Sequence, residues 1–407
     1  MSNLTLKEYI SLSWRKAVTK KKDGELILPY PFVPPCVEGH FRVLFYWDTY
    51  FTNLGLLIDG RVDLALNNVN DLIFALDHFG CVPNYTRDDG AKWCSQPPLL
   101  TLMVKDVYMA IKDKEWLDSA VTKIEKEYSF WMTKRITPIG LNQFGTNQKN
   151  VDELSSYYDY VQQRIGAKEN LTKEEKALKA VDFVSEAESG EDFTPRYVDH
   201  NASEYVQIDL NSHLLGVEKF LSDYYADKDN EKHDNYEKCA KKRLGLLKKY
   251  CFDESTSLYF DYNFIKQKRS ERICAACFLP FFYGFAKEKS ALESLYKNLS
   301  TNAGIVACED TGEYVYQWGY PNVWAPHQYF AYVALKNNGL DKFVEELSEN
   351  YMRLLEKEFL RTGKIWERYD TGGVAKALEY ETQPMLGWTA GVYNYFWMNK
   401  SRKNLSV

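Results

Sequence analysis

The feature that most constrains the fold of this chain is the spacing of its apolar residues. In several long windows they recur at intervals of three and four, the period of one face of an α-helix. The windows cover residues 63–79, 209–225, 236–250, 322–335 and 341–359. Long segments with the alternation of β-strands are missing from the sequence. We therefore expect an all-α protein.

The predicted helices follow one another in pairs, with proline and glycine concentrated between them. About a dozen helices without a repeat of fixed length favour a closed (α/α)6 barrel, a helical toroid, over a solenoid. We expect one domain over residues 1–407, although length alone would allow more than one. Residues 146–192 are polar and rich in tyrosine, and there we expect an irregular, lid-like insertion that contains one charged helix at 172–180.

The charge balance argues against a nucleic-acid partner, since 51 Lys and Arg oppose 57 Asp and Glu. Residues 1–22 predict an amphipathic helix with a basic end and lack the apolar core of a signal peptide. No segment has the length and apolarity of a membrane span. We expect a cytoplasmic protein with no membrane association and no required protein partner.

The eight cysteines are too sparse for a disulfide framework in a chain this long. Cys274 and Cys277 form a CxxC pair, but the pair lies in an apolar run without a second pair at metal-binding spacing. We therefore expect free thiols and no metal. The aromatic content of 15% fits either helix packing or stacking against the apolar faces of sugars.

Three segments are too polar and aromatic for ordinary turns, and the first is residues 39–51. It is dense in aromatic rings and contains one acid, Asp48, directly after Trp47. Asp48 could cap a helix that begins near Thr49. Alternatively, Trp47 is a platform for a sugar and Asp48 accepts hydrogen bonds from its hydroxyls.

The second segment, residues 187–197, contains three acids around a glycine: Glu188, Glu191 and Asp192. Carboxylates this close oppose each other's ionisation, and contact with Phe193 would raise the pKa of one of them further. Such a group can donate a proton near neutral pH. The alternative is a solvated acidic loop.

The third segment, residues 365–392, places Glu367 between Trp366 and Arg368. The neighbouring arginine would favour the charged carboxylate, as a base that activates water requires. Equally, Glu367 and Arg368 could be surface charges at a helix end.

Taken in order, these segments and others resemble the trehalase family of glycoside hydrolases over residues 28–397. The matching motifs are FYWDTYF at 45–51, VPN at 82–84, SQPP at 95–98, ESG at 188–190 with DF at 192–193, QWGYPNVWAP at 317–326, and the stretch 367–392. The resemblance implies an (α/α)6 barrel that hydrolyses α-glucosidic bonds with inversion and without a cofactor.

The resemblance also assigns roles to single residues. Asp192 matches the family's general acid and Glu367 its general base. An inverting enzyme needs this pair, one group to protonate the leaving oxygen and one to activate water. The matching sugar-binding positions are Trp47, Asp48, Asn84, Gln96, Gly190 and Glu379. The 317–326 motif adds Trp318 and Tyr320 as an aromatic wall, and His40 and Phe41 are further substrate-binding candidates.

The sequence departs from the family where trehalases carry arginines that hold the second glucose. His40 and Cys94 stand at two of these positions, and residues 145–160 lack the Arg-Pro-Glu segment. Trehalose is one candidate substrate, and another α-glucoside or α-mannoside, including a glucosyl- or mannosylglycerate, is at least as good a match. The side chains expected to read such a leaving group are His40, Arg42, Lys92 and Arg196.

Two other functions fit a helical toroid. A catalytically inactive carbohydrate-binding protein would need the aromatic platform but not both carboxylates. A sugar epimerase would use paired histidine or tyrosine bases, and the chain has six histidines.

Overall fold

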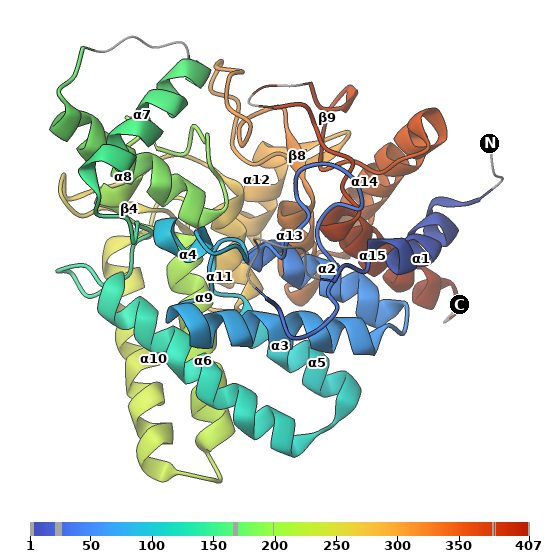
Figure 1. The fold of residues 1–407 in the computed structure, drawn as a ribbon, viewed down its shortest axis with the longest axis horizontal. Helices are drawn as coiled ribbons and strands as arrows, with labels where there is room; N and C mark the ends of the chain where they lie inside the picture. The colour runs from blue at the N-terminus through green and yellow to red at the C-terminus, as the bar shows by residue number, and fades with distance from the viewer. Residues whose placement is uncertain are drawn as a thin grey trace.

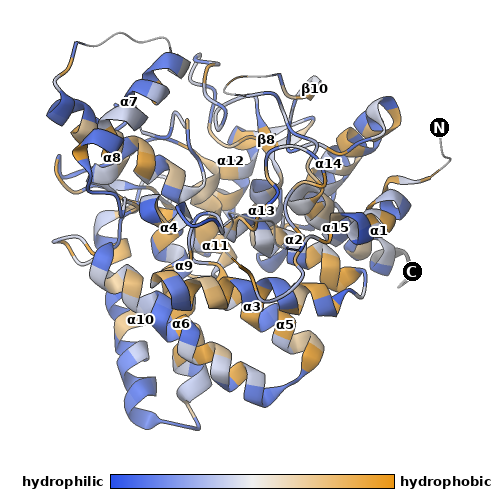
Figure 2. Ribbon diagram, viewed as in Figure 1, coloured by the Kyte–Doolittle hydropathy of each residue, from blue (hydrophilic) through white to orange (hydrophobic). Residues whose placement is uncertain are grey.

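The computed structural model describes residues 4–20, 27–165, 170–197, 199–376, 378 and 380–405. Helices dominate this part of the chain, which confirms the all-α prediction (Figure 1). The helices predicted at 63–79, 209–225 and 341–359 are Val62–Phe79, Ile208–Tyr225 and Asp341–Thr362. The agreement follows from local chemistry, because Val62–Phe79 and Asp341–Thr362 each bury an apolar stripe and expose polar residues. Figure 2 shows hydrophobic and hydrophilic residues alternating along the first of these helices, α3. Ile208–Tyr225 differs, since its first half is buried on most sides.

The helices divide into an inner and an outer ring, which confirms the predicted (α/α)6 toroid. The inner ring is formed by α2 (Tyr46–Ile58), α5 (Leu100–Ile111), α9 (Ile208–Tyr225), α11 (Leu279–Phe282), α13 (Ala325–Asn337) and α15 (Gly387–Leu405). The outer helices are α1 (Leu6–Ala17), α3 (Val62–Phe79), α6 (Lys114–Lys134), α10 (Asn230–Tyr250), α12 (Lys289–Leu299) and α14 (Asp341–Thr362). Short helical turns, α4 (Gly90–Trp93), η1 (Ala202–Glu204) and η2 (Ala275–Phe278), lie in the connections.

The ring closes where α15 packs along α2 (Figure 1). The two helices approach closely because glycines meet at their crossing. A Cβ on Gly391 would overlap the carbonyl oxygen of Phe51, and a Cβ on Gly55 would come within 2.8 Å of the Gly391 Cα. Only residues without a side chain permit this contact.

Short antiparallel strands connect the helices. One sheet has the order β1 (Tyr205–Val206), β4 (Tyr262–Asn263), β5 (Lys268–Arg269), and a second has the order β10 (Gly373–Val374), β9 (Arg368–Asp370), β8 (Val323–Trp324). Two-stranded sheets pair β2 (Phe252–Asp253) with β3 (Leu258–Tyr259) and β6 (Ser300–Thr301) with β7 (Gly304–Ile305). In the second sheet Trp324 pairs with Arg368, which fixes Glu367 beside the 317–326 motif.

In place of an irregular insertion at 146–192, the structure has a helical hairpin, α7 (Val151–Ile165) and α8 (Lys173–Ser189), at one edge of the toroid (Figure 1). The hairpin has a hydrophobic cluster separate from the main core, in which Leu154, Tyr158 and Val161 take part. Their spacing of four and three residues is that of a helix face. Movement of this hairpin as a lid stays a prediction.

All eight cysteines are unpaired, as expected. Within the described ranges, we find no helix with both the length and the apolar character needed to cross a bilayer.

Candidate active site

A cavity of about 440 Å³ brings most of the predicted site residues together. Nine of the predicted residues line it: Phe41, Trp47, Asp48, Asn84, Gln96, Gly190, Asp192, Trp318 and Glu367. They come from connections and helix ends far apart in the sequence. The ionisable side chains that line it, apart from tyrosines, are the carboxyl groups of Asp48, Asp192 and Glu367, as far as the structure describes the chain.

Trp47 and Asp48 lie in the first turn of α2, which begins at Tyr46. The N-cap residue is Phe45 and makes no side-chain cap, so the interpretation of Asp48 as a helix cap is wrong. Asp48 instead lines the cavity, with 5% of its surface exposed. The backbone N–H of Trp47 donates to Oε1 of Gln96 at 3.1 Å, which fixes the orientation of that amide.

Gly190 lies two residues before the predicted acid, Asp192, and the local structure requires a glycine there. It ends α8 in the left-handed conformation, with φ of 81°. A Cβ there would come within 2.7 Å of the Trp47 indole. The glycine therefore both reverses the chain and lets the tryptophan ring lie against the backbone.

The three acids around Gly190 have different surroundings, and none of them belongs to a solvated loop. Oε1 of Glu191 lies 2.8 Å from Nε2 of His327, and its Oε2 lies 3.5 Å from a guanidinium nitrogen of Arg196. Glu188 is fully buried and pairs with Arg135. Asp192 alone of the three lines the cavity. We expected the three carboxylates to repel one another. Instead, Glu188 and Glu191 each have a separate partner.

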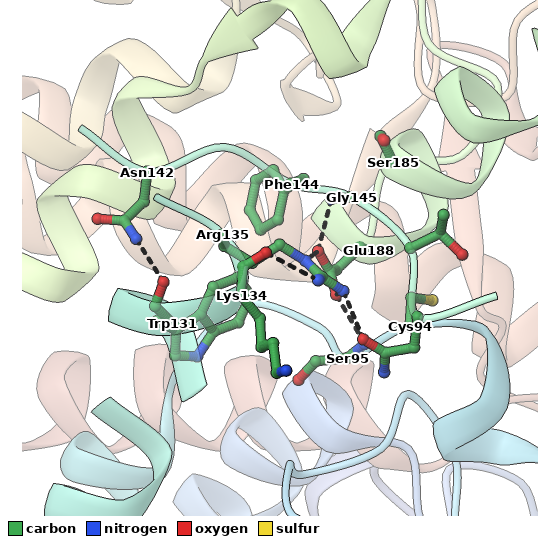
Figure 3. Close-up of polar contacts among 12 residues, drawn as sticks. Cys94, Ser95, Trp131, Lys134, Arg135, Asn142, Phe144, Gly145, Ser185 and Glu188 are labelled. Carbon is green, nitrogen blue, oxygen red and sulfur yellow. Dashed lines mark hydrogen bonds and ion pairs between the residues drawn. The ribbon is translucent and has the colours of Figure 1, made fainter. Parts of the chain in front are cut away.

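Glu188 joins the end of α8 to three other segments, as Figure 3 shows. Its Oε2 accepts from Nε of Arg135 and from the backbone N–H of Gly145, both at 2.6 Å. Its Oε1 accepts from another Arg135 nitrogen at 2.7 Å and from the N–H of Ser95 at 2.9 Å. These bonds satisfy a buried charge and fix the end of α8 against the loop that carries Gln96.

Asp192 is held by Gln317, the first residue of the 317–326 motif. The Nε2 of Gln317 donates to both Oδ2 and the backbone carbonyl of Asp192 at 3.1 Å. The Oε1 of the same amide accepts from Arg368 at 3.2 Å. The amide orientation is therefore set by the arginine, and it presents a donor to the predicted acid.

The loop after Asp192 is fixed by Glu186. Its Oε2 accepts from the N–H of Phe193 at 3.1 Å, and its Oε1 lies 3.0 Å from Nδ1 of His200. Phe193 has a φ of 64°, an uncommon conformation for a residue with a side chain. The contact with Glu186 stabilises this conformation directly beside the acid.

Glu367 lies just before β9, and its exposed fraction is 3%. Its Oε1 accepts from the Tyr380 hydroxyl at 2.5 Å and its Oε2 from the N–H of Gln383 at 3.3 Å. Burial raises the pKa of Glu367 to about 7, against the lowering effects of Tyr380 and of Arg368. The carboxyl group of Asp192 raises this pKa further, so the two predicted catalysts influence each other electrostatically.

Arg368 is not a surface charge, so that alternative for the third segment is wrong. Its side chain is fully buried and donates to Gln317, to Thr382 and to the carbonyls of Lys376 and Tyr380. Burial and the nearby Glu367 also raise the pKa of Asp48 well above its usual range.

Two buried polar atoms in the lining have no hydrogen-bond partner among the described residues: Oδ1 of Asn84 and Nε1 of Trp318. One accepts and the other donates. Buried polar atoms are nearly always bonded, so these two match the hydroxyl groups of a ligand. The Trp318 ring stacks on Trp324 at 3.8 Å, and Trp47 and Trp388 lie beside it.

Several predicted residues lie elsewhere. His40 is exposed and does not line the cavity. Tyr320 packs near Tyr314 and is likewise outside the lining. Arg196, expected to read the leaving group, is fully buried between Asp209 and Asp261, at 2.8 and 2.7 Å. Glu379 lies outside the described residues.

Other lining residues carried no assigned role in the sequence. Phe45, Trp324, Tyr380 and Trp388 stand inside the recognised motifs, and their places there were a usable signal. Met385 also lies in the stretch 367–392, whereas no motif gave a signal for the remaining lining residues, Tyr85, Tyr157, Tyr160 and Ala187.

Comparisons with known proteins identify the family and the fold. A family model described as Trehalase matches residues 3–400. The chain is 29% identical to a periplasmic trehalase of Escherichia coli O1:K1, over 95% of this chain and 73% of the relative. Among solved structures, neutral trehalase Nth1 from Saccharomyces cerevisiae has a TM-score of 0.77 at 24% identity, covering 100% of this chain and 82% of that one. A GH63 mannosylglycerate hydrolase from Thermus thermophilus in complex with glucose has a TM-score of 0.64 at 15% identity, covering 97% and 100%.

Proposed function

Because the chain belongs to the trehalase family and is a glycoside hydrolase, we propose that it cleaves an α-glucosidic bond with inversion, using Asp192 and Glu367. The observation that carries this proposal is that both carboxyl groups line one cavity with Trp47, Gln96 and Asn84. The order of motifs in the sequence thus corresponds to a single site.

Asp192 is the proposed general acid, which protonates the leaving oxygen as the glycosidic bond breaks. Glu367 is the proposed general base, which takes a proton from the attacking water. A base with a pKa of about 7 is half deprotonated at neutral pH and strong enough to assist water. Asp48, in the first turn of α2, is proposed to bind sugar hydroxyls.

The proposed substrate is an α-glucoside whose leaving group need not be the second glucose of trehalose. Cys94 stands at a family arginine position, is buried, and accepts a hydrogen bond from Asn84 at 3.8 Å. A thiol cannot replace the five donors of a guanidinium. Trehalose and mannosides stay open as substrates for direct assay.

The test is hydrolysis by Asp192→Asn and Glu367→Gln. Each variant should lose about 10²–10⁴-fold in kcat, as expected for loss of a general acid or base, and should keep a native circular dichroism spectrum. NMR of the first product should show the β anomer from an α substrate. Wild-type turnover in both variants, or an α product, would refute the proposed roles.

The rival functions make different predictions. An epimerase releases no second fragment, and within the described ranges no histidine lines the cavity. A binding protein would not turn over any glycoside, whereas the presence of two positioned carboxyl groups favours turnover. The cytoplasmic location stays a proposal that cell fractionation can test, and the matched E. coli relatives are named as periplasmic.

A further inference from the structure

His200 lies where two parts of the site meet, although it does not line the cavity. Its Nδ1 lies 3.0 Å from Oε1 of Glu186, which belongs to α8. Its Nε2 lies 3.3 Å from the hydroxyl of Tyr316, in the segment that leads to Gln317. The imidazole packs against the rings of Phe183 and Tyr316, with centroids at 5.4 and 5.5 Å. This side chain therefore joins α8 to the segment that carries Gln317.

Both contacts of the imidazole lead directly to Asp192, the proposed general acid. On the α8 side, Oε2 of Glu186 accepts from the N–H of Phe193, the residue that follows Asp192. On the other side, Gln317 follows Tyr316 and donates to Oδ2 and to the carbonyl of Asp192. The imidazole therefore connects the group that holds the backbone after the acid with the group that holds its carboxyl oxygen.

The chemistry of the two contacts allows both protonation states of the histidine. An ionised carboxylate only accepts hydrogen bonds, so Nδ1 of His200 carries a hydrogen and donates to Glu186. A tyrosine hydroxyl both donates and accepts, so Tyr316 can bond a neutral or a protonated Nε2. Glu186 is buried, and the imidazole and the Phe193 N–H supply hydrogen-bond donors to its two oxygens.

We propose that His200 is a positioning residue, which holds Asp192 within reach of the leaving oxygen through Glu186 and Tyr316. This inference rests on the proposed hydrolase function and adds to it a residue outside the cavity lining.

The proposed reaction shows what a displaced acid would change. A water oxygen bonds to the anomeric carbon and gives its proton to Glu367, while the bond from that carbon to the leaving oxygen breaks and Asp192 protonates that oxygen. Proton transfer requires close approach of the two oxygens. A displaced acid therefore slows this step and leaves substrate binding unchanged.

The experiment uses two substrates that differ in their need for an acid. α-Glucosyl fluoride releases fluoride ion, which leaves without being protonated, so its hydrolysis needs the sugar site and the base but little help from the acid. The second substrate releases an alcohol and needs the proton of Asp192. It is whichever of trehalose, α-glucosylglycerol and methyl α-glucoside the wild-type protein hydrolyses fastest. The ratio of the two kcat values measures how well the acid is placed.

The first variant is His200→Asn. Asparagine tolerates the left-handed backbone of this position, with φ of 48°, but lacks the ring that reaches Tyr316. The variant should lower kcat on the alcohol-releasing substrate by about five- to fiftyfold, which is part of the contribution of a general acid. Its kcat on glucosyl fluoride and both KM values should stay within about twofold of the wild type.

The second variant, Tyr316→Phe, keeps the ring and removes the hydroxyl that contacts Nε2 of His200. It should lower kcat on the alcohol-releasing substrate by about two- to tenfold, as loss of one neutral hydrogen bond predicts, and should spare glucosyl fluoride. Because both changes break the same contact, the double variant should equal His200→Asn within about twofold. The matched control is Tyr314→Phe, at an exposed tyrosine that bonds Asp310, and it should change neither rate.

The outcomes separate this inference from the hydrolase assignment. Equal losses on both substrates in the two variants would mean that the contact only stabilises the fold, and they overturn the positioning role. Wild-type kcat on the alcohol-releasing substrate in both variants overturns it as well. So does a wild-type protein that hydrolyses glucosyl fluoride but none of the three alcohol-releasing compounds.

Failure of the wild-type protein to hydrolyse glucosyl fluoride overturns the hydrolase assignment and this inference together. If His200→Asn does not fold, as judged by circular dichroism, the milder Tyr316→Phe decides the question by the same ratio of kcat values.

Discussion

Replacing Tyr380 by phenylalanine tests the electrostatics of the proposed base. The Tyr380 hydroxyl donates to Glu367 at 2.5 Å and lowers the pKa of that carboxyl group, which burial holds at about 7. A hydrogen bond to a charged group contributes about 1.5–3 kcal/mol, and about 1.36 kcal/mol corresponds to one pKa unit. Tyr380→Phe should therefore move the pKa of Glu367 upward by about one to two units.

The sign of the effect on activity follows from the role of a base. Glu367 must be deprotonated to accept a proton, so the ascending limb of kcat/KM against pH reports its pKa in the free enzyme. In Tyr380→Phe this limb should move from near pH 7 to about pH 8–9. At pH 7 the deprotonated fraction, and with it kcat/KM, should fall about five- to fiftyfold. Activity should recover as the pH rises.

The assay is glucose release from α-glucosyl fluoride between about pH 5 and pH 10, a range that brackets both limbs. A loss that is the same at every pH would mean that the hydroxyl binds substrate without tuning the base. A limb that stays in place or moves to lower pH would refute the reasoning. The matched control is Tyr128→Phe, which removes a tyrosine-to-glutamate bond of 2.8 Å, to Glu218, away from the cavity. Its pH profile should equal that of the wild type.

The other predictions concern residues that hold the site in place and the crossing of α2 with α15. Glu188→Gln leaves a buried arginine without its counter-charge and should lower the free energy of unfolding by about 3–5 kcal/mol, measured by urea denaturation. Gln317→Ala should lower kcat about five- to thirtyfold with little change in KM, because Asp192 loses an orienting donor; equal effects on both constants would contradict this. Gly391→Ala should destabilise the protein by about 3 kcal/mol or more through overlap at the crossing, whereas Gly245→Ala, with open space around it, should be neutral or stabilising in thermal unfolding.

The fold could be predicted because a helix requires a regular spacing of apolar residues within its own segment. The apolar spacing of α3, α9 and α14 is visible within each segment alone. The α7 helix has the same spacing in Leu154, Tyr158 and Val161, but its many polar residues obscured it. Tyr157 and Tyr160, which line the cavity from α7, were missed for that reason.

The sequence predicted which residues form the site better than it predicted the contacts those residues make. Trp47, Gly190 and Asp192 stand in motifs, and all three meet at the cavity. The directions of Glu188 and Arg196 depend on partners 53 and 65 residues away, Arg135 and Asp261. Proximity along the chain carries no information about such partners, so a cluster of acids in sequence gave a misleading picture of their electrostatics.

The closure of the ring by α15 against α2 has a consequence for synthesis of the protein. Asp48 is carried by α2, the first helix of the inner ring, whereas Glu367 precedes β9 and Trp388 lies in α15, both late in the chain. Domains generally fold from the N-terminus as the chain leaves the ribosome, but contacts between distant segments form only when both are available. A nascent chain therefore contains Trp47 and the proposed acid, Asp192, before the proposed base, Glu367. We expect hydrolysis only once α15 has packed against α2 and the carboxyl groups share one cavity.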